Sequence, residues 1–267
     1  MTGTMPAPPG PQRNTHVVHH LEEVMGTVVT IDVYADAAVP PSEVAPLVHR
    51  ACAVLHEADD IFSTWKADSP MSRVRRGEIT TAMAPPEIAA VLELCTTARR
   101  LSDGWFDPWA LPGGVDPTGY VKGWAAQRAL AALAAPFVIG AIVNAAGDIA
   151  SFGVLDGSQS FRFGIVNPLV RGELLCVVEG TDALATSGSY ERGPHLVDPH
   201  TGAAVVTVAS ATVSGPDLGL ADALATAVAV AGDEGLPIVA ALEGYDAMIV
   251  TLDGTMHRTA EFPVVPG

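Results

Sequence analysis

Hydrophobic residues in the first half of the chain recur with a helical period. Between residues 42 and 61, after Pro41, apolar side chains return every three or four positions, which predicts a long amphipathic helix. The recurring positions are Val44, Leu47, Val48, Ala51, Leu55 and Ala58. Further helices are predicted over residues 87–101, 120–134 and 217–231.

Short β-rich runs make up most of the remaining pattern. Residues 28–34 alternate and are rich in β-branched side chains, which predicts a strand near the start of the chain. Later strands are predicted over residues 137–143, 149–153, 161–166, 174–178, 195–197, 207–213, 247–252 and 256–259. Because helices and strands come in blocks rather than in strict alternation, the order favours an α+β fold with largely antiparallel sheets flanked by helices.

Composition limits the partners of such a fold. The 267 residues are 49% hydrophobic, enough for a sizeable core, and carry a formal net charge of −16. That charge argues against nucleic acid or an anionic membrane as the main partner. Any phosphate ligand must then be held locally by a metal ion, a lysine or backbone N–H groups, because the overall field repels anions.

The organisation of the chain follows from its start, its cysteines and one apolar stretch. We expect residues 1–16 to form a disordered Pro-rich tail and residues 17–267 to form one domain. Without a signal-like apolar start, and with three widely spaced cysteines that form neither a disulfide framework nor a C-x-x-C zinc motif, a cytoplasmic protein is expected. Residues 129–147 carry no charge, but Pro136 and Gly140 predict a helix end, a turn and a strand there, not a transmembrane segment.

Asp222 and Thr226 are the first candidates for metal chemistry. They lie four residues apart in a predicted helix, so their side chains leave the same face one turn apart. A carboxylate and a hydroxyl are oxygen ligands suited to Mg²⁺ that is held also by a substrate phosphate. Taken alone, the pair is more typical of a solvated helix face, with the threonine hydroxyl bonded to the helix backbone, because polar pairs at this spacing are common on helices.

Residues 116–122 combine a turn with the start of a helix. Pro117 and Gly119 predict a turn whose backbone groups are free to contact a ligand, and Lys122 adds a positive charge near the helix N-terminus. This arrangement is suited to an anion. The alternative is that Asp116 caps the helix while the lysine stem lies along the surface.

His195 is the candidate general base. It alone of the eight histidines lies in a tight polar cluster, between Gly193-Pro194 and Asp198-Pro199. Imidazole titrates near neutral pH and could take the proton of an incoming hydroxyl, although a structural histidine at a strand start is the alternative. The sequence carries no P-loop, dinucleotide-binding, serine-hydrolase or zinc-protease motif.

Several short motifs follow one another along nearly the whole chain after the tail. They are Met25-Gly26-Thr27, residues 62–65 (Phe-Ser-Thr-Trp), residues 68–73, Trp105-Phe106-Asp107-Pro108, and residues 116–124, 144–149, 187–202 and 221–227. In this order they resemble the ApbE flavin transferases, also called FAD:protein FMN transferases. Each motif alone is weak, and their shared order carries the resemblance.

The resemblance implies two coupled lobes with an active site between them. It also implies a Mg²⁺-dependent enzyme that moves FMN from FAD, its substrate, onto a threonine of an acceptor protein and releases AMP. The family's metal ligands fall on the Gly119 carbonyl, Asp222 and Thr226, and its base falls on His195. Its flavin-binding positions fall on Met25, Trp65, Trp105, Phe106, Asp107, Asp116, Lys122 and Leu196.

Two departures from the family pattern bear on the reaction. Paired glycines are common before the family's Asp, and here Ala146 replaces one of them in the run Ala145-Ala146-Gly147-Asp148. In some members an acidic residue before the metal-binding threonine can serve a second metal, whereas here the residue is Ala225, which favours transfer over FAD hydrolysis. An FAD pyrophosphatase that yields FMN and AMP, and a non-catalytic flavin-binding protein, are the alternatives.

Overall fold

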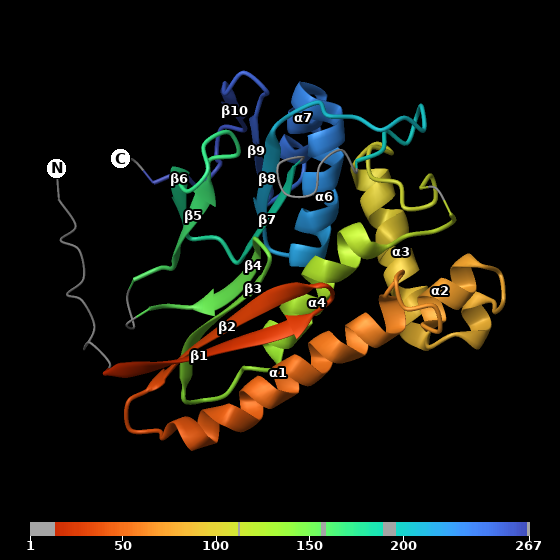
Figure 1. The fold of residues 1–267 in the computed structure, drawn as a ribbon. Helices are drawn as coiled ribbons and strands as arrows, with labels where there is room; N and C mark the ends of the chain where they lie inside the picture. The colour runs from red at the N-terminus through yellow and green to blue at the C-terminus, as the bar shows by residue number, and fades with distance from the viewer. Residues whose placement is uncertain (1–13, 112, 156–158, 189–195, 266–267) are drawn as a thin grey trace.

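An antiparallel sheet runs through the centre of the molecule (Figure 1). The computed structural model describes residues 14–111, 113–155, 159–188 and 196–265. Within them the eight-stranded sheet has the order β1-β2-β3-β4-β7-β8-β9-β10, and β5 pairs with β6 in a second, two-stranded sheet. Every strand pair is antiparallel, which confirms the predicted α+β class with antiparallel sheets.

The strands and helices have the following bounds. The large sheet contains β1 (Thr15–Val24), β2 (Thr27–Asp36), β3 (Val138–Ala145), β4 (Asp148–Gly153), β7 (Ala183–Gly188), β8 (Ser210–Gly215), β9 (Asp246–Val250) and β10 (Met256–Arg258). The small sheet contains β5 (Arg162–Val166) and β6 (Leu174–Glu179). The helices are α1 (Pro41–Phe62), α2 (Pro70–Arg75), α3 (Pro86–Leu101), α4 (Thr118–Ala131), α6 (Leu218–Ala231) and α7 (Gly235–Ala240), with short 3₁₀ turns η1 (Thr81–Met83) and η2 (Gly232–Glu234).

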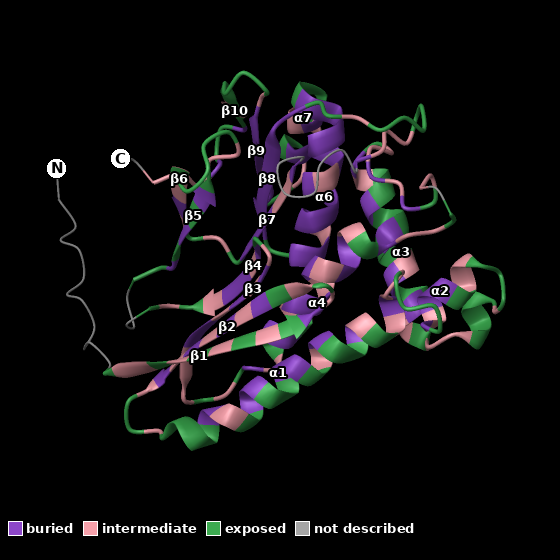
Figure 2. Cartoon of the chain, in the orientation of Figure 1, coloured by how far each residue is buried: buried purple, intermediate pink, exposed green. Residues whose placement is uncertain are grey.

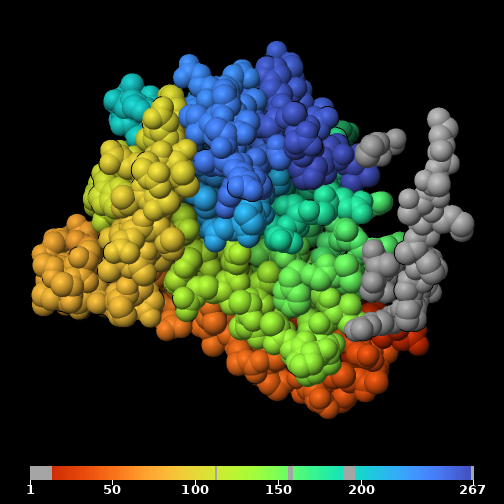
Figure 3. Space-filling model, turned by 180° about the vertical axis from the view of Figure 1, so that it is seen from behind, coloured from red at the N-terminus to blue at the C-terminus, as the bar shows by residue number. Residues whose placement is uncertain are grey.

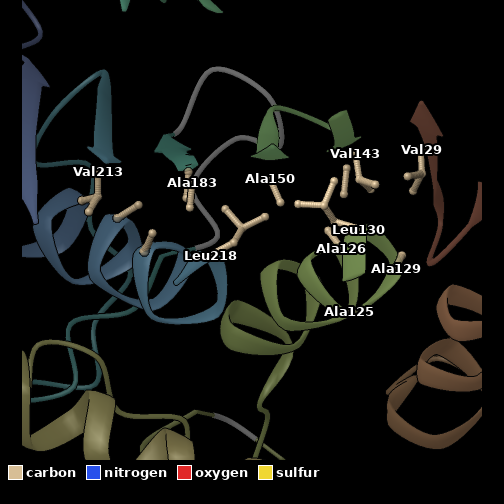
Figure 4. Close-up of a cluster of buried hydrophobic side chains, with 14 of the residues drawn as sticks. Val29, Ala125, Ala126, Ala129, Leu130, Val143, Ala150, Ala183, Val213 and Leu218 are labelled. Carbon is tan, nitrogen blue, oxygen red and sulfur yellow. The ribbon is translucent and has the colours of Figure 1, made fainter. Parts of the chain in front are cut away.

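Alternation along the strands divides the core between the two faces of the sheet. On β2, Val29, Ile31 and Val33 are fully buried in the cluster that the sheet shares with α1, α4 and α6, and Figure 4 shows Val29 and Val143 on the side of α4. Tyr34 points the other way, into a smaller cluster with β5 and β6. Seen from behind, α4 and α6 lie side by side, next to α1 and α3 (Figure 3).

The predicted helices agree with the structure to within three residues at each end. The apolar positions that predicted α1 are all buried, as the helical period requires. Residues 129–147 form the end of α4, a turn and β3, as expected. The predicted strand over 207–213 begins later, at Ser210, because residues 207 and 208 precede the pairing of β8 with β7.

Strands β1 and β7 were not predicted. On β1 the half-buried face carries the polar residues His20 and Glu22, while the apolar Leu21 is 69% exposed. The alternation of apolar and polar residues is therefore opposite to the one expected for a strand with a buried face. β7 consists mainly of small residues with weak strand propensity and is held by its neighbours β4 and β8. β1 begins at Thr15, so the last two residues of the expected tail belong to a strand, while residues 1–13 lie outside the described residues.

Helix α6 is the most completely buried of the long helices (Figure 2). Asp217 caps its start by accepting a hydrogen bond from the Leu220 N–H at 2.7 Å. In the part of the chain that the structure describes, one stretch, Leu218–Ala240, has the length and composition of a membrane span. Because 61% of that window is buried inside the protein, its apolar surface is used for packing against the sheet and α4.

Candidate functional site

Helices α4 and α6 approach each other closely because glycines lie where they meet. A Cβ atom on Gly123 would overlap the carbonyl oxygen of Leu218, and one on Gly219 would lie 2.8 Å from the ring of Tyr120. The Gly123 N–H donates a hydrogen bond to Asp222 Oδ2 at 3.2 Å. Residues 99 positions apart in the chain are thereby held in direct contact.

The three predicted metal ligands lie together at this crossing. Gly119 is in the first turn of α4, and its Cβ position would lie 3.6 Å from Thr226 Oγ1 on α6. Asp222, one turn before Thr226, is only 3% exposed. Ser187 on β7 adds a hydroxyl 3.2 Å from Thr226 Oγ1. The donor set is therefore made of oxygens, as Mg²⁺ prefers, and a Cβ atom at Gly119 would lie in tight contact with the Phe106 ring, so the residues fit such an ion.

Lys122 forms an ion pair with Asp148, which sequence reasoning did not place among the site residues. The Asp148 side chain is fully buried at the start of β4, and its Oδ1 accepts a hydrogen bond from the Thr186 N–H at 3.1 Å. A buried carboxylate is stable only when paired and hydrogen-bonded. The pair joins α4, β4 and β7 immediately beside Ser187. In the sequence, Asp148 could have been noticed as an acidic residue at the start of a strand whose other residues are largely buried.

Two tight hairpin turns bring Met25 and Ala146 to the same end of the sheet. β2 pairs with β3 so that Val29 is opposite Ala145, which aligns the β1–β2 turn with the β3–β4 turn. Met25 and Ala146 have positive φ values of 54° and 52°, each followed by a glycine with positive φ. This is the pattern of a two-residue type I′ turn. The Ala146 position is therefore a strained one for a residue with a side chain.

Aromatic residues after α3 form a wall near the crossing. Phe106 is buried, and its ring carbon lies 3.3 Å from the Cβ position of Gly119. The rings of Trp105 and His200 meet edge to face at 4.6 Å, which brings the segment after Leu196 against the segment after α3. Asp107 pairs with Arg99 at 2.7 Å.

The remaining predicted flavin positions differ in their surroundings. Asp116 pairs with Arg75 of α2 at 2.9 Å and accepts a hydrogen bond from the Thr118 N–H, so it closes the turn before α4 and links that turn to α2. Leu196 is buried in the main core. Trp65 is 95% exposed on the segment after α1, so the described structure does not bury it against the other predicted positions. His195 and the expected start of a strand at 195–197 lie outside the described residues, and Val197 forms only an isolated bridge with Ala204.

Comparison with known proteins identifies the family of the chain. The model of the ApbE family matches residues 25–113 and 111–249. A curated FAD:protein FMN transferase from Rhodobacter capsulatus is 36% identical over 157 residues, which are 55% of this chain and 30% of that protein, so the match spans less than a third of the relative's length.

Solved structures show the same fold. The flavin transferase ApbE from Vibrio cholerae has a TM-score of 0.79 at 21% identity, covering 93% of this chain and 99% of that one. The ApbE protein from Thermotoga maritima has a TM-score of 0.76 at 23% identity, covering 92% and 97%. The Pseudomonas stutzeri flavinyl transferase ApbE has a TM-score of 0.75 at 21% identity, covering 93% and 96%. With the family model matching most of its length, this chain belongs to the ApbE family.

Proposed function

We propose that this chain is a Mg²⁺-dependent FAD:protein FMN transferase whose acceptor is a threonine hydroxyl. The observation that carries the proposal is the convergence of Gly119, Asp222 and Thr226 at the α4–α6 crossing. The name of the Rhodobacter capsulatus relative, FAD:protein FMN transferase, gives independent support. Bound there, Mg²⁺ would offset the charge of the FAD diphosphate, which the net charge of −16 otherwise repels.

The chain's own residues then bind and orient the substrates. The Gly119 carbonyl, Asp222 and Thr226 would hold the ion, while Met25 and the wall around Trp105 would receive the flavin. Lys122 would contribute its positive charge to the diphosphate, and its pair with Asp148 holds the ammonium group at the start of β4. Fixed charges of this kind act in phosphoryl transfer mainly by positioning and by stabilising charge.

The proposed reaction breaks the phosphoanhydride bond between the two phosphates of FAD and forms a phosphoester bond to threonine. The acceptor threonine oxygen attacks the FMN-side phosphorus, a new P–O bond forms, and the bond to the AMP phosphate breaks. His195 takes the hydroxyl proton, and AMP leaves with the electron pair of the broken bond. FAD and the threonine are thus converted to the FMN-threonine ester and AMP, with no oxidation or reduction.

Transfer is favoured over FAD hydrolysis by the residue before Thr226. Ala225 is fully buried and has no carboxylate with which to hold a second metal. Incubation with FAD and Mg²⁺ alone separates the two activities, because a pyrophosphatase accumulates AMP without any acceptor. A non-catalytic flavin carrier would instead bind FAD tightly even after chelation of the metal, and it would produce neither AMP nor a labelled acceptor.

The decisive experiment combines the chain, FAD, Mg²⁺ and an acceptor domain that carries a flavinylation threonine. We expect in-gel flavin fluorescence and the mass of one FMN on the acceptor, and neither when that threonine is replaced by valine. Asp222→Asn should lower labelling by about 100-fold or more. Asp217→Asn is the matched control, because it changes a carboxylate on the same helix while keeping a residue able to cap. Undiminished labelling in Asp222→Asn or after chelation would contradict the proposal.

We also propose that the reaction takes place in the cytoplasm. All three cysteines are free thiols, with Cys52 and Cys95 buried, which is compatible with a reducing compartment. Cell fractionation with an antibody against the chain tests this, and recovery from the periplasm or the cell surface would contradict it.

A further inference from the structure

Four side chains outside the flavin site converge between β1 and α1. His20 Nε2 lies 2.9 Å from Glu22 Oε2, and His56 Nε2 lies 2.8 Å from Glu22 Oε1. The thiol of Cys52 also hydrogen-bonds to Glu22. The ligand atoms of His20, Glu22 and Cys52 all lie within 4.8 Å of one another. None of these residues belongs to the predicted oxygen site, and β1 and α1 contribute no ligand to that site.

We propose that His20, Glu22, Cys52 and His56 form a binding site for a Zn²⁺-class transition-metal ion, separate from the magnesium site. Two imidazoles, one thiol and one carboxylate are the donor types that zinc takes in proteins. Mg²⁺ prefers an all-oxygen set, so the two sites select different ions.

Local geometry explains why these four side chains face one another. His20 and Glu22 are two residues apart on β1, so they point to the same face of the strand, the one that packs on α1. Cys52 and His56 are four residues apart on α1, so they leave the same side of the helix one turn apart. The strand contributes two donors and the helix contributes two.

Burial is graded across the cluster. Cys52 is buried at 8% exposure, whereas the side chains of His20 and His56 are 34% and 50% exposed. The cluster therefore has its thiol in the core and its two imidazoles accessible to solvent. A preformed site needs such an entry path for the ion.

The protonation states of Glu22 and Cys52 determine whether a proton must leave when an ion binds. Hydrogen bonds from His20 and His56 lower the pKa of Glu22 to about 2, so the carboxylate is charged at neutral pH. Burial and the neighbouring Glu22 raise the pKa of Cys52 to about 12. On binding, the S–H bond of Cys52 breaks, a metal–sulfur bond forms, and the proton passes to the buffer.

A comparison on the same strand separates this cluster from an ordinary ion pair. His19 pairs with Asp32 at 2.7 Å, but that pair is on the opposite face of β1 and includes no thiol. A histidine–carboxylate pair on this strand thus forms without a sulfur ligand. The added convergence of Cys52 and a second imidazole is what indicates a metal site.

The site would fasten the edge of the sheet. β1 is the outermost strand beside β2, and an edge strand has one unpaired side. An ion held by two donors from β1 and two from α1 would tie that strand to the helix. Zinc should therefore raise the melting temperature of the full chain.

The test is a zinc titration of the full chain after treatment with a chelator, by calorimetry, with bound metal counted by elemental analysis. We expect one Zn²⁺ at this site in the unmodified chain and in Asp222→Asn, which removes a ligand of the other site. His20→Ala and Cys52→Ser should each weaken binding at least about tenfold. His19→Ala and Cys176→Ser are the matched controls and should bind as the unmodified chain does.

Cobalt provides a readout specific to sulfur. Co²⁺ bound at the site should show a thiolate-to-cobalt charge-transfer band that Cys52→Ser loses and Cys176→Ser keeps. His56→Gln, at an exposed position, weakens binding without disturbing the core if the proposal is right. Unchanged zinc affinity in His56→Gln and Cys52→Ser, or cobalt binding without the band, would overturn it. None of these measurements uses FAD or an acceptor, so their failure is distinct from failure of the transferase proposal.

Discussion

Two clusters of potential ligands in this chain are built in opposite ways. The oxygen cluster at the α4–α6 crossing is buried and joins segments that are distant in the sequence, with Asp222 at 3% exposure. The cluster of His20, Glu22, Cys52 and His56 is half-exposed and joins two elements close in the chain. The first depends on close helix packing, whereas the second needs only one strand laid on one helix. Changes to the packing should therefore damage the oxygen cluster far more than the nitrogen and sulfur cluster.

Gly123→Ala should have the largest effect. The new methyl group overlaps the Leu218 carbonyl, so α4 and α6 must separate, at a cost of about 3 kcal/mol or more of unfolding free energy. Urea denaturation measures this. Gly172→Ala is the comparison, because no atom lies within 4 Å of its new Cβ, although its φ of 85° adds a backbone strain that Gly123 in α4 lacks. Equal destabilisation by the two variants would show that the crossing is not tightly packed.

Asp222→Ala should follow, with its effect mainly on activity. Loss of a metal ligand worth about 3 kcal/mol in the transition state lowers FMN transfer by about 100-fold or more. Steady-state labelling of an acceptor at several Mg²⁺ concentrations measures this. Zinc affinity should stay unchanged in the same variant. A parallel loss of zinc binding would mean that the two clusters are not independent.

Lys122→Met should destabilise the chain less than Gly123→Ala. The fully buried Asp148 loses its ion-pair partner, which costs about 3 kcal/mol when the pair is deeply buried and less here, because the Lys122 side chain is 24% exposed. Thermal melting measures this, and transfer activity should fall less than in Asp222→Ala. The double variant Lys122→Met/Asp148→Asn should recover part of the stability. No recovery would show that the pair is not the source of the loss.

Ala146→Gly should have the smallest effect, and a stabilising one. Removing the methyl group relieves the positive φ of 52° and gains about 1 kcal/mol, partly offset by the greater freedom of glycine in the unfolded chain. Chemical denaturation detects a change of this size. Ala145→Gly, at a buried position on β3, should instead destabilise. A stabilisation by both would show that the turn is not the strained element.

The residue patterns predicted most helices and strands, and they predicted which residues lie side by side on one helix. The helical period predicted α1 and α3, because a buried stripe every 3.6 residues is a local property of the chain. The spacing of Asp222 and Thr226 put both on one face of α6 for the same reason. The ordered motifs also carried the ApbE resemblance, and the family match confirms it.

Only the tertiary structure showed which helices and strands contact each other, and through which residues. A period shows which face of an element is buried but not what covers it, so the sequence could mark Asp148 as unusual but could not pair it with Lys122, nor Ser187 with Thr226. β1 was missed because its half-buried face carries charged and polar residues that find partners on α1. The spacing of the cysteines likewise indicated no metal motif, because His20 and Glu22 come from β1 and meet Cys52 only through the packing of that strand on α1.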